Sequence, residues 1–337
     1  MTRACILGCS GATLTASERD FFRDAAPWGF ILFKRNIDHP DQVRALTDAL
    51  REAVSRDAPV LVDQEGGRVQ RLAAPHWRAY PPGRTYGALG RDTALSRAAA
   101  TWYGARLIAH DLLSVGINVD CMPVLDVPVP GAHAVIGDRA YGDDPDIVAC
   151  LGRAAAEGLL AGGVLPVMKH VPGHGRALAD SHEALPVVEA GLAELETRDF
   201  VPFRRLADLP VAMTAHVVFT ALDPTAPATT SPSVIREVVR GAIGFRGLLL
   251  SDDLSMNALQ GTLGERARAA LAAGCDIGLH CNGRLDEMEQ VAEGAPLLAG
   301  EPLRRAEAAL GQIGQAPQPL DPAEAWQRLD AALASVA

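Results

Sequence analysis

The chain has 337 residues, of which 48% are hydrophobic and 21% charged, and its formal net charge is −10. This composition excludes a disordered chain. The negative charge, which no basic run offsets, disfavours nucleic acid and anionic membranes as partners. No apolar run approaches the roughly 20 residues of a membrane span, and the first residues lack a signal-peptide pattern. We therefore expect a soluble, cytoplasmic protein, and no obligate protein partner is predicted.

The cysteines are scattered through the chain rather than grouped. Four of the six fall in or beside predicted strands, and a chain without an export signal keeps such thiols reduced. The three-residue spacing between the first two is a poor metal pattern. We expect reduced core cysteines rather than disulfides among Cys5, Cys9, Cys121, Cys150, Cys275 and Cys281.

Short apolar runs alternate with longer helical patterns from one end of the chain to the other. The predicted strands are residues 4–7, 29–33, 60–62, 117–122, 165–168, 211–214, 248–250 and 276–279. The predicted helices between them are residues 17–25, 40–55, 93–115, 145–161, 192–206, 233–242 and 263–273. Several of these helices start at capping residues such as Ser17, and several are followed by a glycine such as Gly274.

Eight strands that alternate with helices, about 35 to 40 residues apart, favour one closed α/β barrel, a (β/α)8 fold, over a doubly wound sheet. We expect a single catalytic domain, with the barrel over about residues 3–296. Two further helices, predicted over 302–313 and 322–335, form a C-terminal extension at about 297–337 that we expect on the outside of the barrel. No linker long enough for a second domain interrupts the chain.

Titratable residues stand at the ends of six of the predicted strands. Any one of them could be a cap or an ion-pair partner, but barrels of this kind keep their active sites at the carboxyl-terminal ends of the strands. The residues are Asp63, Asp126, Lys169 with His170, His216, Asp252 with Asp253, and His280. Together they predict an active site at this end of the barrel.

The chain is organised around the stretch from Lys169 to His182. A buried strand stops at a cation and an imidazole, and a Gly/Pro-rich loop then delivers Asp180 and His182. A carboxylate beside a histidine orients the ring and stabilises its protonated form, so the pair can donate and accept a proton. A helix cap or solvated turn is the structural alternative for the same Asp-Ser-His sequence.

Asp252 directly follows an apolar strand, which suits a nucleophile that must be held in a fixed position. Asp253 points to the opposite side of the chain, where it would hold the loop or the next helix. The sequence favours Asp252 over Asp253 as the reacting carboxylate and leaves the alternative open.

Four motifs, in order and spacing, resemble glycoside hydrolase family 3, and more narrowly its single-domain bacterial β-N-acetylglucosaminidases of cell-wall recycling. The motifs are DQEGGRV at 63–69, IGDR at 136–139, KHVPGHG at 169–175 with DSH at 180–182, and SDDLSM at 251–256. The resemblance spans nearly the whole chain. Val171 stands where the family usually has phenylalanine, which puts no catalytic residue in doubt.

The resemblance implies a retaining exo-β-N-acetylhexosaminidase that releases terminal N-acetylglucosamine from β-1,4-linked muropeptides through a covalent glycosyl-enzyme intermediate. It implies Asp252 as nucleophile and His182 as proton donor and acceptor, oriented and assisted by Asp180. It also implies that no metal or organic cofactor is needed. The substrate-binding residues that it implies are Asp63, Arg71, Arg139, Lys169 and His170.

Two other function classes compete with this prediction. A metal-dependent amidohydrolase on the same barrel would use histidines placed like His170 and His216, but it also needs a His-x-His motif after the first strand, where residues 7–11 read LGCSG. A non-catalytic sugar-binding protein would keep the pocket, although binding alone does not require Asp252 together with the Asp180 and His182 pair. Substrate-assisted hydrolysis is a variant within the glycosidases; it usually requires an Asp-Glu pair, where this chain has Asp252-Asp253.

Overall fold

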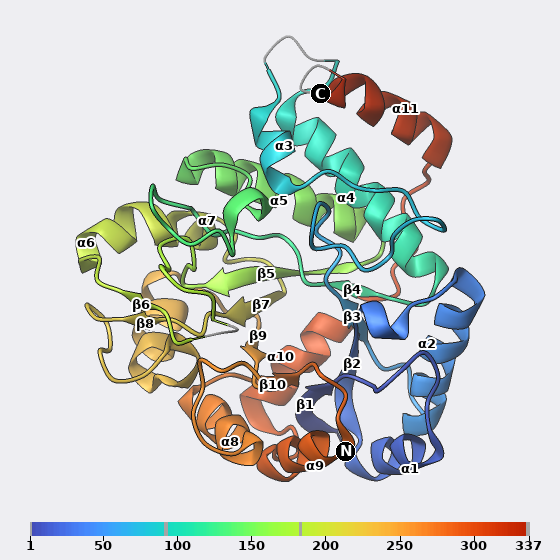
Figure 1. The fold of residues 1–337 in the computed structure, drawn as a ribbon, viewed down its shortest axis with the longest axis vertical. Coiled ribbons are helices and arrows are strands. Elements are labelled where there is room, and N and C mark those ends of the chain that lie inside the picture. The colour runs from blue at the N-terminus through green and yellow to red at the C-terminus, as the bar shows by residue number, and fades with distance from the viewer. Residues whose placement is uncertain (1, 91–93, 182–183, 335–337) are drawn as a thin grey trace.

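The computed structural model describes residues 2–90, 94–181 and 184–334. Eight parallel strands close into a barrel in the order β1-β10-β9-β7-β5-β4-β3-β2, and helices surround it (Figure 1). The barrel strands are β1 (Arg3–Leu7), β2 (Pro27–Leu32), β3 (Val60–Val62), β4 (Val119–Asp120), β5 (Leu165–Val171), β7 (Val211–Thr214), β9 (Leu248–Asp253) and β10 (Ile277–His280). The predicted (β/α)8 fold is confirmed, and each predicted strand overlaps one of these eight.

The helices follow the predicted ranges closely, with some additions. Among the described residues, the α-helices α3 (Gly83–Ala88) and α9 (Leu285–Gly294) were not predicted. A two-stranded sheet, also not predicted, pairs β6 (Val187–Val188) with β8 (Val218–Phe219). The expected helix at 192–206 contains a π-helical segment (Leu195–Asp199) between α6 and α7, and the one at 233–242 is π-helical over Val234–Ala242. The α-helices are α1 (Ala16–Ala25), α2 (Pro40–Val54), α3 (Gly83–Ala88), α4 (Arg97–Ser114), α5 (Pro145–Ala161), α6 (Leu192–Glu194), α7 (Phe200–Arg205), α8 (Leu263–Ala273), α9 (Leu285–Gly294), α10 (Gly300–Leu310) and α11 (Pro322–Leu333).

Side-chain alternation along the strands divides the core into two clusters. Ile6 and Leu61 belong to the cluster inside the barrel, whereas their neighbours Leu7 and Val62 pack toward the surrounding helices. Both faces of a strand are therefore buried, which explains why the strands read as continuous apolar runs rather than alternating ones. All six cysteines are free thiols, and five of them are buried, as expected for reduced core residues.

The two C-terminal helices take different positions. α11 packs outside the barrel on α4, with the ring of Trp326 5.0 Å from that of Tyr80, as expected. α10 packs against the amino-terminal end of the barrel rather than beside the strands. Its residues Ala306 and Ala309 belong to the cluster inside the barrel, because α10 covers the amino-terminal opening (Figure 1).

A buried carboxylate fastens α10 to the barrel. Asp276, at the start of β10, accepts hydrogen bonds from Arg305 of α10 and from Arg240, both at 2.9 Å. It also accepts one from the Leu249 amide of β9 at 2.9 Å. Removing one member of such a buried group leaves charges without partners in a place where water cannot compensate.

Asp276→Asn is therefore expected to lower the free energy of unfolding by about 3 kcal/mol, measured by urea denaturation at pH 7. The control is Asp20→Asn, which removes the exposed ion pair with Arg23 and should cost less than about 1 kcal/mol. Equal effects of the two substitutions would contradict the assigned role of Asp276.

Candidate active site

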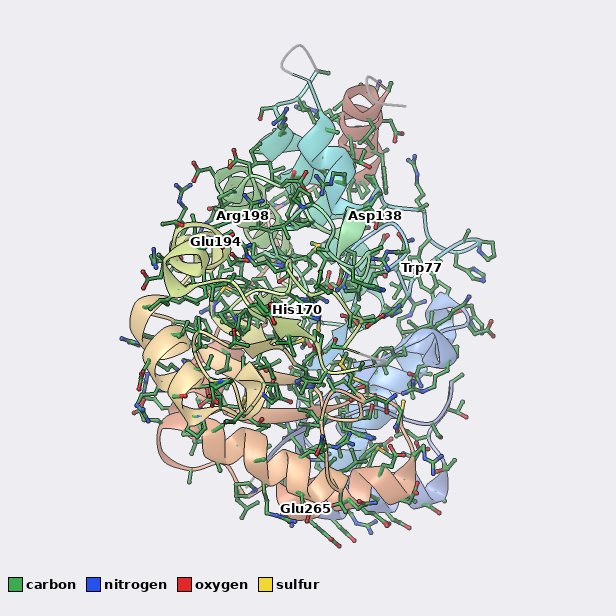
Figure 2. The ribbon with its side chains drawn as sticks, turned by 60° about the vertical axis from the view of Figure 1, so that its left-hand side comes forward. Trp77, Asp138, His170, Glu194, Arg198 and Glu265 are labelled. Atoms are coloured by element: carbon green, nitrogen blue, oxygen red, sulfur yellow. The ribbon has the colours of Figure 1, made fainter. Side chains whose placement is uncertain are left out.

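A cavity opens at the carboxyl-terminal end of the barrel and gathers most of the residues singled out in the sequence. It is lined by residues of β2, β5, β7, β9 and β10 and of the loops that follow the strands. His170 lies near the centre of the molecule (Figure 2). Glu194 and Arg198 lie farther out, on and beside the helices (Figure 2). Of the predicted site residues, the cavity is lined by Asp63, Arg71, Arg139, Lys169, His170, Asp180 and Asp252.

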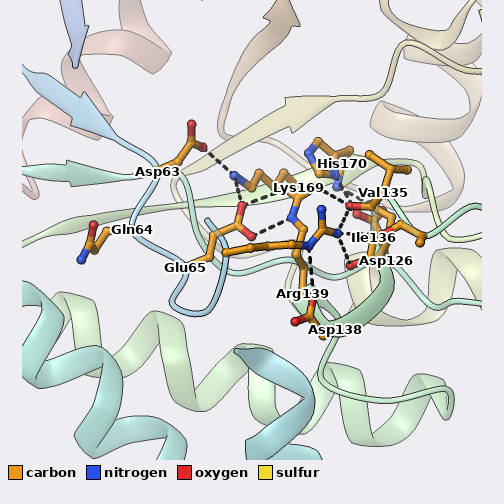
Figure 3. Close-up of polar contacts among 12 residues, drawn as sticks. Asp63, Gln64, Glu65, Asp126, Val135, Ile136, Asp138, Arg139, Lys169 and His170 are labelled. Carbon is orange, nitrogen blue, oxygen red and sulfur yellow. Dashed lines mark hydrogen bonds and ion pairs between the residues drawn. The ribbon is translucent and has the colours of Figure 1, made fainter. Parts of the chain in front are cut away.

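Five alternating charges lie along one wall of this cavity, and Figure 3 shows four of them, Asp63, Lys169, Glu65 and Arg139. The Lys169 ammonium lies 2.8 Å from Asp63 Oδ1 and 2.6 Å from Glu65 Oε1. Arg139 donates two parallel hydrogen bonds to Glu65, each 2.8 Å long. Arg71 donates to the other oxygen of Asp63 at 3.2 Å. Each charge thus holds the next, and the side chains that would bind substrate are fixed in advance.

Burial and pairing act in opposite directions on these groups. Burial favours the neutral form of each carboxyl, but Arg139 and Lys169 outweigh it and lower the pKa of Glu65 to about 2. Lys169 and Arg71 likewise hold the pKa of Asp63 below its usual range against the effect of burial. For Lys169 burial alone would lower the pKa, and the two carboxylates raise it instead. All of these groups are therefore ionised at neutral pH.

Two glycines make it possible for Glu65 to reach this position. Gly66 and Gly67 have φ of +89° and +56°, a region that favours glycine, and a Cβ on Gly66 would lie 2.3 Å from the carbonyl oxygen of Pro81. The turn presents Arg68, which bonds to Asp138 and to carbonyls of the 134–136 loop. This loop carries Arg139, so the turn after β3 and the loop after β4 are joined.

A second buried carboxylate positions two histidines. Asp126 accepts from His170 Nδ1 at 2.6 Å and from the backbone amide of His174 at 2.6 Å. A carboxylate can only accept, so the proton of His170 lies on Nδ1. Burial, with a contribution from His170, lowers the pKa of His174 to about 4, so that ring is neutral at pH 7. Its Nε2 lies 3.2 Å from the hydroxyl of Ser181, in the loop that carries Asp180.

The two neighbouring carboxylates of β9 are in different surroundings. Asp253 accepts from the backbone amide and hydroxyl of Ser255 and from the amide of Cys281, so it holds the following loop, as expected. Asp252 is 7% exposed, and its Oδ1 accepts from the Asp253 amide at 2.8 Å. Although burial opposes ionisation, His216, His170 and the Asp253 amide together lower the pKa of Asp252. At neutral pH Asp252 is an anion, as a nucleophile requires.

The predicted acid/base pair is only partly covered by the described residues. Asp180 lines the cavity. His182 lies outside the described residues, so its role stays a prediction. The stem of the loop before this pair is well fastened: Arg176 bonds to Asp199 at 2.8 Å, and Gly175 leaves no room for a side chain, since a Cβ there would lie 2.2 Å from the Val127 oxygen.

The geometry at His216 disfavours the amidohydrolase alternative. His216 Nε2 lies 2.9 Å from the carbonyl oxygen of Asp253 and Nδ1 lies 2.7 Å from the hydroxyl of Thr229, so neither ring nitrogen is available to a metal. Among residues 2–90, 94–181 and 184–334, no group of three or more His, Cys, Asp or Glu side chains has an arrangement that could hold a metal ion. Over the same ranges, no helix is both long and apolar enough to cross a bilayer.

Three contributors to the site were not assigned roles from the sequence: Glu65, Asp126 and His174. Glu65 lies inside a motif that was recognised, and Asp126 was noted only as a residue at a strand end. The sequence did contain a signal for Glu65, because the two glycines that follow it suggest a tight turn. Such a turn can direct the carboxylate into the site. The pairing of each residue depends on contacts between distant parts of the chain, 74 positions apart for Glu65 and Arg139.

A parallel barrel with paired charges and an ionised strand-end carboxylate in its mouth defines a glycosidase-type site, and comparison with known proteins agrees. Residues 12–303 match the family model described as the glycosyl hydrolase family 3 N terminal domain. The chain belongs to glycosyl hydrolase family 3. The prediction of an enzyme of the β-N-acetylhexosaminidase type is confirmed by relatives that are named beta-hexosaminidase.

Relatives in the family resemble the chain over most of their length. A protein named beta-hexosaminidase from Alkalilimnicola ehrlichii is 44% identical over 82% of this chain and 80% of its own. A beta-hexosaminidase from Pseudomonas aeruginosa is 42% identical over 84% of each chain. The crystal structure of native NagZ from Neisseria gonorrhoeae superposes with a TM-score of 0.88 at 33% identity, covering 99% of this chain and 98% of the other.

The pKa of Glu65 predicts acid sensitivity of the fold. A carboxyl whose pKa is lower in the folded than in the unfolded chain stabilises the fold fully at pH values above the unfolded-state pKa. This stabilisation is lost as the pH falls through the folded-state pKa. We expect the free energy of unfolding to fall by roughly 3 kcal/mol from this group between pH 4.5 and about 2. Urea denaturation at several pH values measures it.

Glu65→Gln should be less stable than the wild type at pH 7 and should show a weaker pH dependence between pH 4.5 and 2. The control is Glu324→Gln, which alters the exposed pair with Arg328 and should keep the wild-type profile. A Glu65→Gln profile parallel to the wild type over this interval would rule out the assigned role of Glu65.

Proposed function

We propose that this chain is a retaining exo-β-N-acetylglucosaminidase that removes the terminal β-1,4-linked N-acetylglucosamine from muropeptides of the N-acetylglucosaminyl-anhydro-N-acetylmuramyl type in cell-wall recycling. The observation that carries the proposal is the ionised Asp252 at the end of β9, in a cavity that it shares with Asp180 and with the paired charges around Lys169. A structure of NagZ from Neisseria gonorrhoeae in complex with N-trifluoroacetyl-D-glucosamine, 34% identical with a TM-score of 0.85, supports the choice of sugar.

In this proposal the paired charges bind the terminal sugar before any bond changes. The hydroxyl groups and the acetamido group would meet carboxylate acceptors, cationic N–H donors and the second ring nitrogen of His170, an acceptor. These groups come from Asp63, Arg71, Arg139, Lys169 and His170. Because their own ion pairs already orient them, little side-chain freedom is lost when the sugar binds. Such charge-assisted hydrogen bonds discriminate strongly between sugars that differ in one hydroxyl group.

The reaction then takes two displacements at the same carbon. An Asp252 oxygen forms a bond to C1 as the bond from C1 to the leaving oxygen breaks, and His182, assisted by Asp180, gives its proton to that oxygen. Next, a water molecule loses its proton to His182 and forms a bond to C1 while the bond to Asp252 breaks. Each displacement inverts C1, so the product keeps the β configuration.

A protonated histidine suits the neighbourhood of an anionic nucleophile. A second carboxylate close to Asp252 would have its own pKa raised and would raise that of Asp252. A histidine avoids this repulsion, since it is positive before it donates and neutral afterwards. The substrate would come from the degradation of peptidoglycan, and the free thiols, five of them buried, agree with a cytoplasmic setting.

The first test is the release of 4-nitrophenol from its β-N-acetylglucosaminide in the presence of EDTA. Wild type should turn over, and Asp252→Asn, which keeps the shape of the side chain, should lose activity on the order of 10⁴-fold. Asp286→Asn, an exposed substitution, is the matched control and should behave as wild type. Activity lost to EDTA would instead favour a metallohydrolase, and sugar binding without turnover a lectin-like protein.

Two further measurements test the finer parts of the proposal. Nuclear magnetic resonance of the fresh product should show the β anomer first, and an α anomer would exclude the double displacement. Incubation with purified muropeptides should release N-acetylglucosamine, and mass spectrometry detects this release. No release from muropeptides, with the nitrophenyl substrate still cleaved, would overturn the proposed substrate and keep the glycosidase.

A further inference from the structure

Behind Asp252 lies a buried set of hydrogen bonds that the proposed reaction does not use. It consists of Thr214 at the end of β7, His216 two residues later, and Thr229 from the 228–230 turn. All three side chains are 0% exposed. None of the three lies among the described residues that line the cavity. They therefore cannot contact the sugar there, and any effect on the reaction must pass through Asp252 or Asp253.

The distances fix where each proton lies. His216 Nε2 is 2.9 Å from the Asp253 carbonyl oxygen, which can only accept, so Nε2 carries the proton. Burial lowers the pKa of His216, so the ring is neutral at pH 7 and accepts at Nδ1, where the Thr229 hydroxyl, 2.7 Å away, is its donor. The Ala215 carbonyl oxygen is farther from the same hydroxyl, at 3.1 Å.

The remaining contacts complete the chain. With its own proton directed to His216, the Thr229 oxygen accepts from the Thr214 hydroxyl at 2.8 Å. The Thr214 oxygen in turn accepts from the backbone amide of Asp252 at 3.3 Å. The sequence of donors runs from the Asp252 amide through both threonines to His216 and back to the Asp253 carbonyl, and every buried polar atom along it has a partner.

This chain begins and ends on the two residues that form the end of β9. The amide between them, that of Asp253, donates to Asp252 Oδ1 at 2.8 Å. The backbone from the Asp252 amide to the Asp253 carbonyl is thus held at both ends, and the carboxylate is held against its middle. A displacement of this backbone would move the carboxylate with it.

We propose that Thr214, Thr229 and neutral His216 are positioning residues for the nucleophile of the reaction. Their hydrogen-bond chain fixes the backbone of Asp252 and Asp253, and thereby the distance from the Asp252 carboxylate to C1 of the sugar. The inference rests on the proposed function, because it takes Asp252 as the group that forms the covalent bond. A misplacement of about 1 Å can cost roughly 100-fold in rate.

The chain offers two matched pairs of variants. Thr229→Val removes the hydroxyl at nearly constant volume, whereas Thr229→Ser keeps it. His216→Leu removes both ring nitrogens, whereas His216→Gln keeps one donor and one acceptor that can reach Asp253 and Thr229. If the role is packing alone, Thr229→Val should resemble wild type. If the role is positioning through hydrogen bonds, Thr229→Val should lose activity, and Thr229→Ser and His216→Gln should resemble wild type.

The measurements are kcat and KM for 4-nitrophenyl β-N-acetylglucosaminide and the rate of covalent labelling at Asp252 by a 5-fluoro glycosyl fluoride of N-acetylglucosamine. Thr229→Val and His216→Leu should lose about 10- to 100-fold in kcat, and labelling should slow by the same factor. KM should change less than threefold, because the cavity wall is unchanged. Thr229→Ser and His216→Gln should recover most of both rates.

Circular dichroism and a urea titration identify variants that fold incompletely. For these variants, gel filtration isolates the folded fraction, and the labelling rate is measured on that fraction. Full kcat and labelling in folded Thr229→Val would overturn the inference, as would a loss confined to KM. The proposed function has its own test and would be contradicted if Asp252→Asn kept its activity. An inactive Asp252→Asn with a fully active Thr229→Val would leave the function intact and remove the positioning role.

Discussion

A buried ammonium group organises this active site. Lys169 is 2% exposed at the end of β5, where its charge would be unstable without partners. Asp63 and Glu65 provide them, and to reach Lys169 the chain after β3 must make the sharp turn at Gly66 and Gly67. Glu65 then holds Arg139 from the loop after β4. One buried charge on β5 therefore determines how the loops after β3 and β4 meet at the mouth of the barrel.

The same pairing keeps the lysine and arginine cations away from Asp252, the proposed nucleophile. Lys169, Arg139 and Arg71 are bonded to Asp63 or Glu65, and across the described ranges no ion pair joins a lysine or arginine to Asp252. Asp252 is ionised without being neutralised by a direct partner. For a reaction that develops positive charge on the sugar ring, this arrangement leaves the carboxylate's charge for the transition state rather than for a resident cation.

The fold could be read from the sequence because the strands of a parallel barrel are buried on both faces, and apolar runs at regular spacing record that burial. The identities of Asp63, Lys169, His170 and Asp252 could be read because each stands where a strand ends. What could not be read were pairings made in three dimensions. Glu65 meets Arg139 and Lys169 only after the barrel closes. The sequence of α10 likewise does not show that Ala306 and Ala309 pack against the inner cluster of the barrel.

The two halves of the proposed chemistry rest on different kinds of structure. The nucleophile belongs to a strand whose end is joined to β7 and the 228–230 turn by buried hydrogen bonds from Thr214, His216 and Thr229. Asp180 belongs to a loop, tied to the barrel through His174 and Ser181. Bond formation at C1 tolerates little error in distance, whereas a proton donor must let the substrate pass before it acts. A rigid strand end suits the first requirement and a loop suits the second, so the division of roles follows from where the chain places each residue.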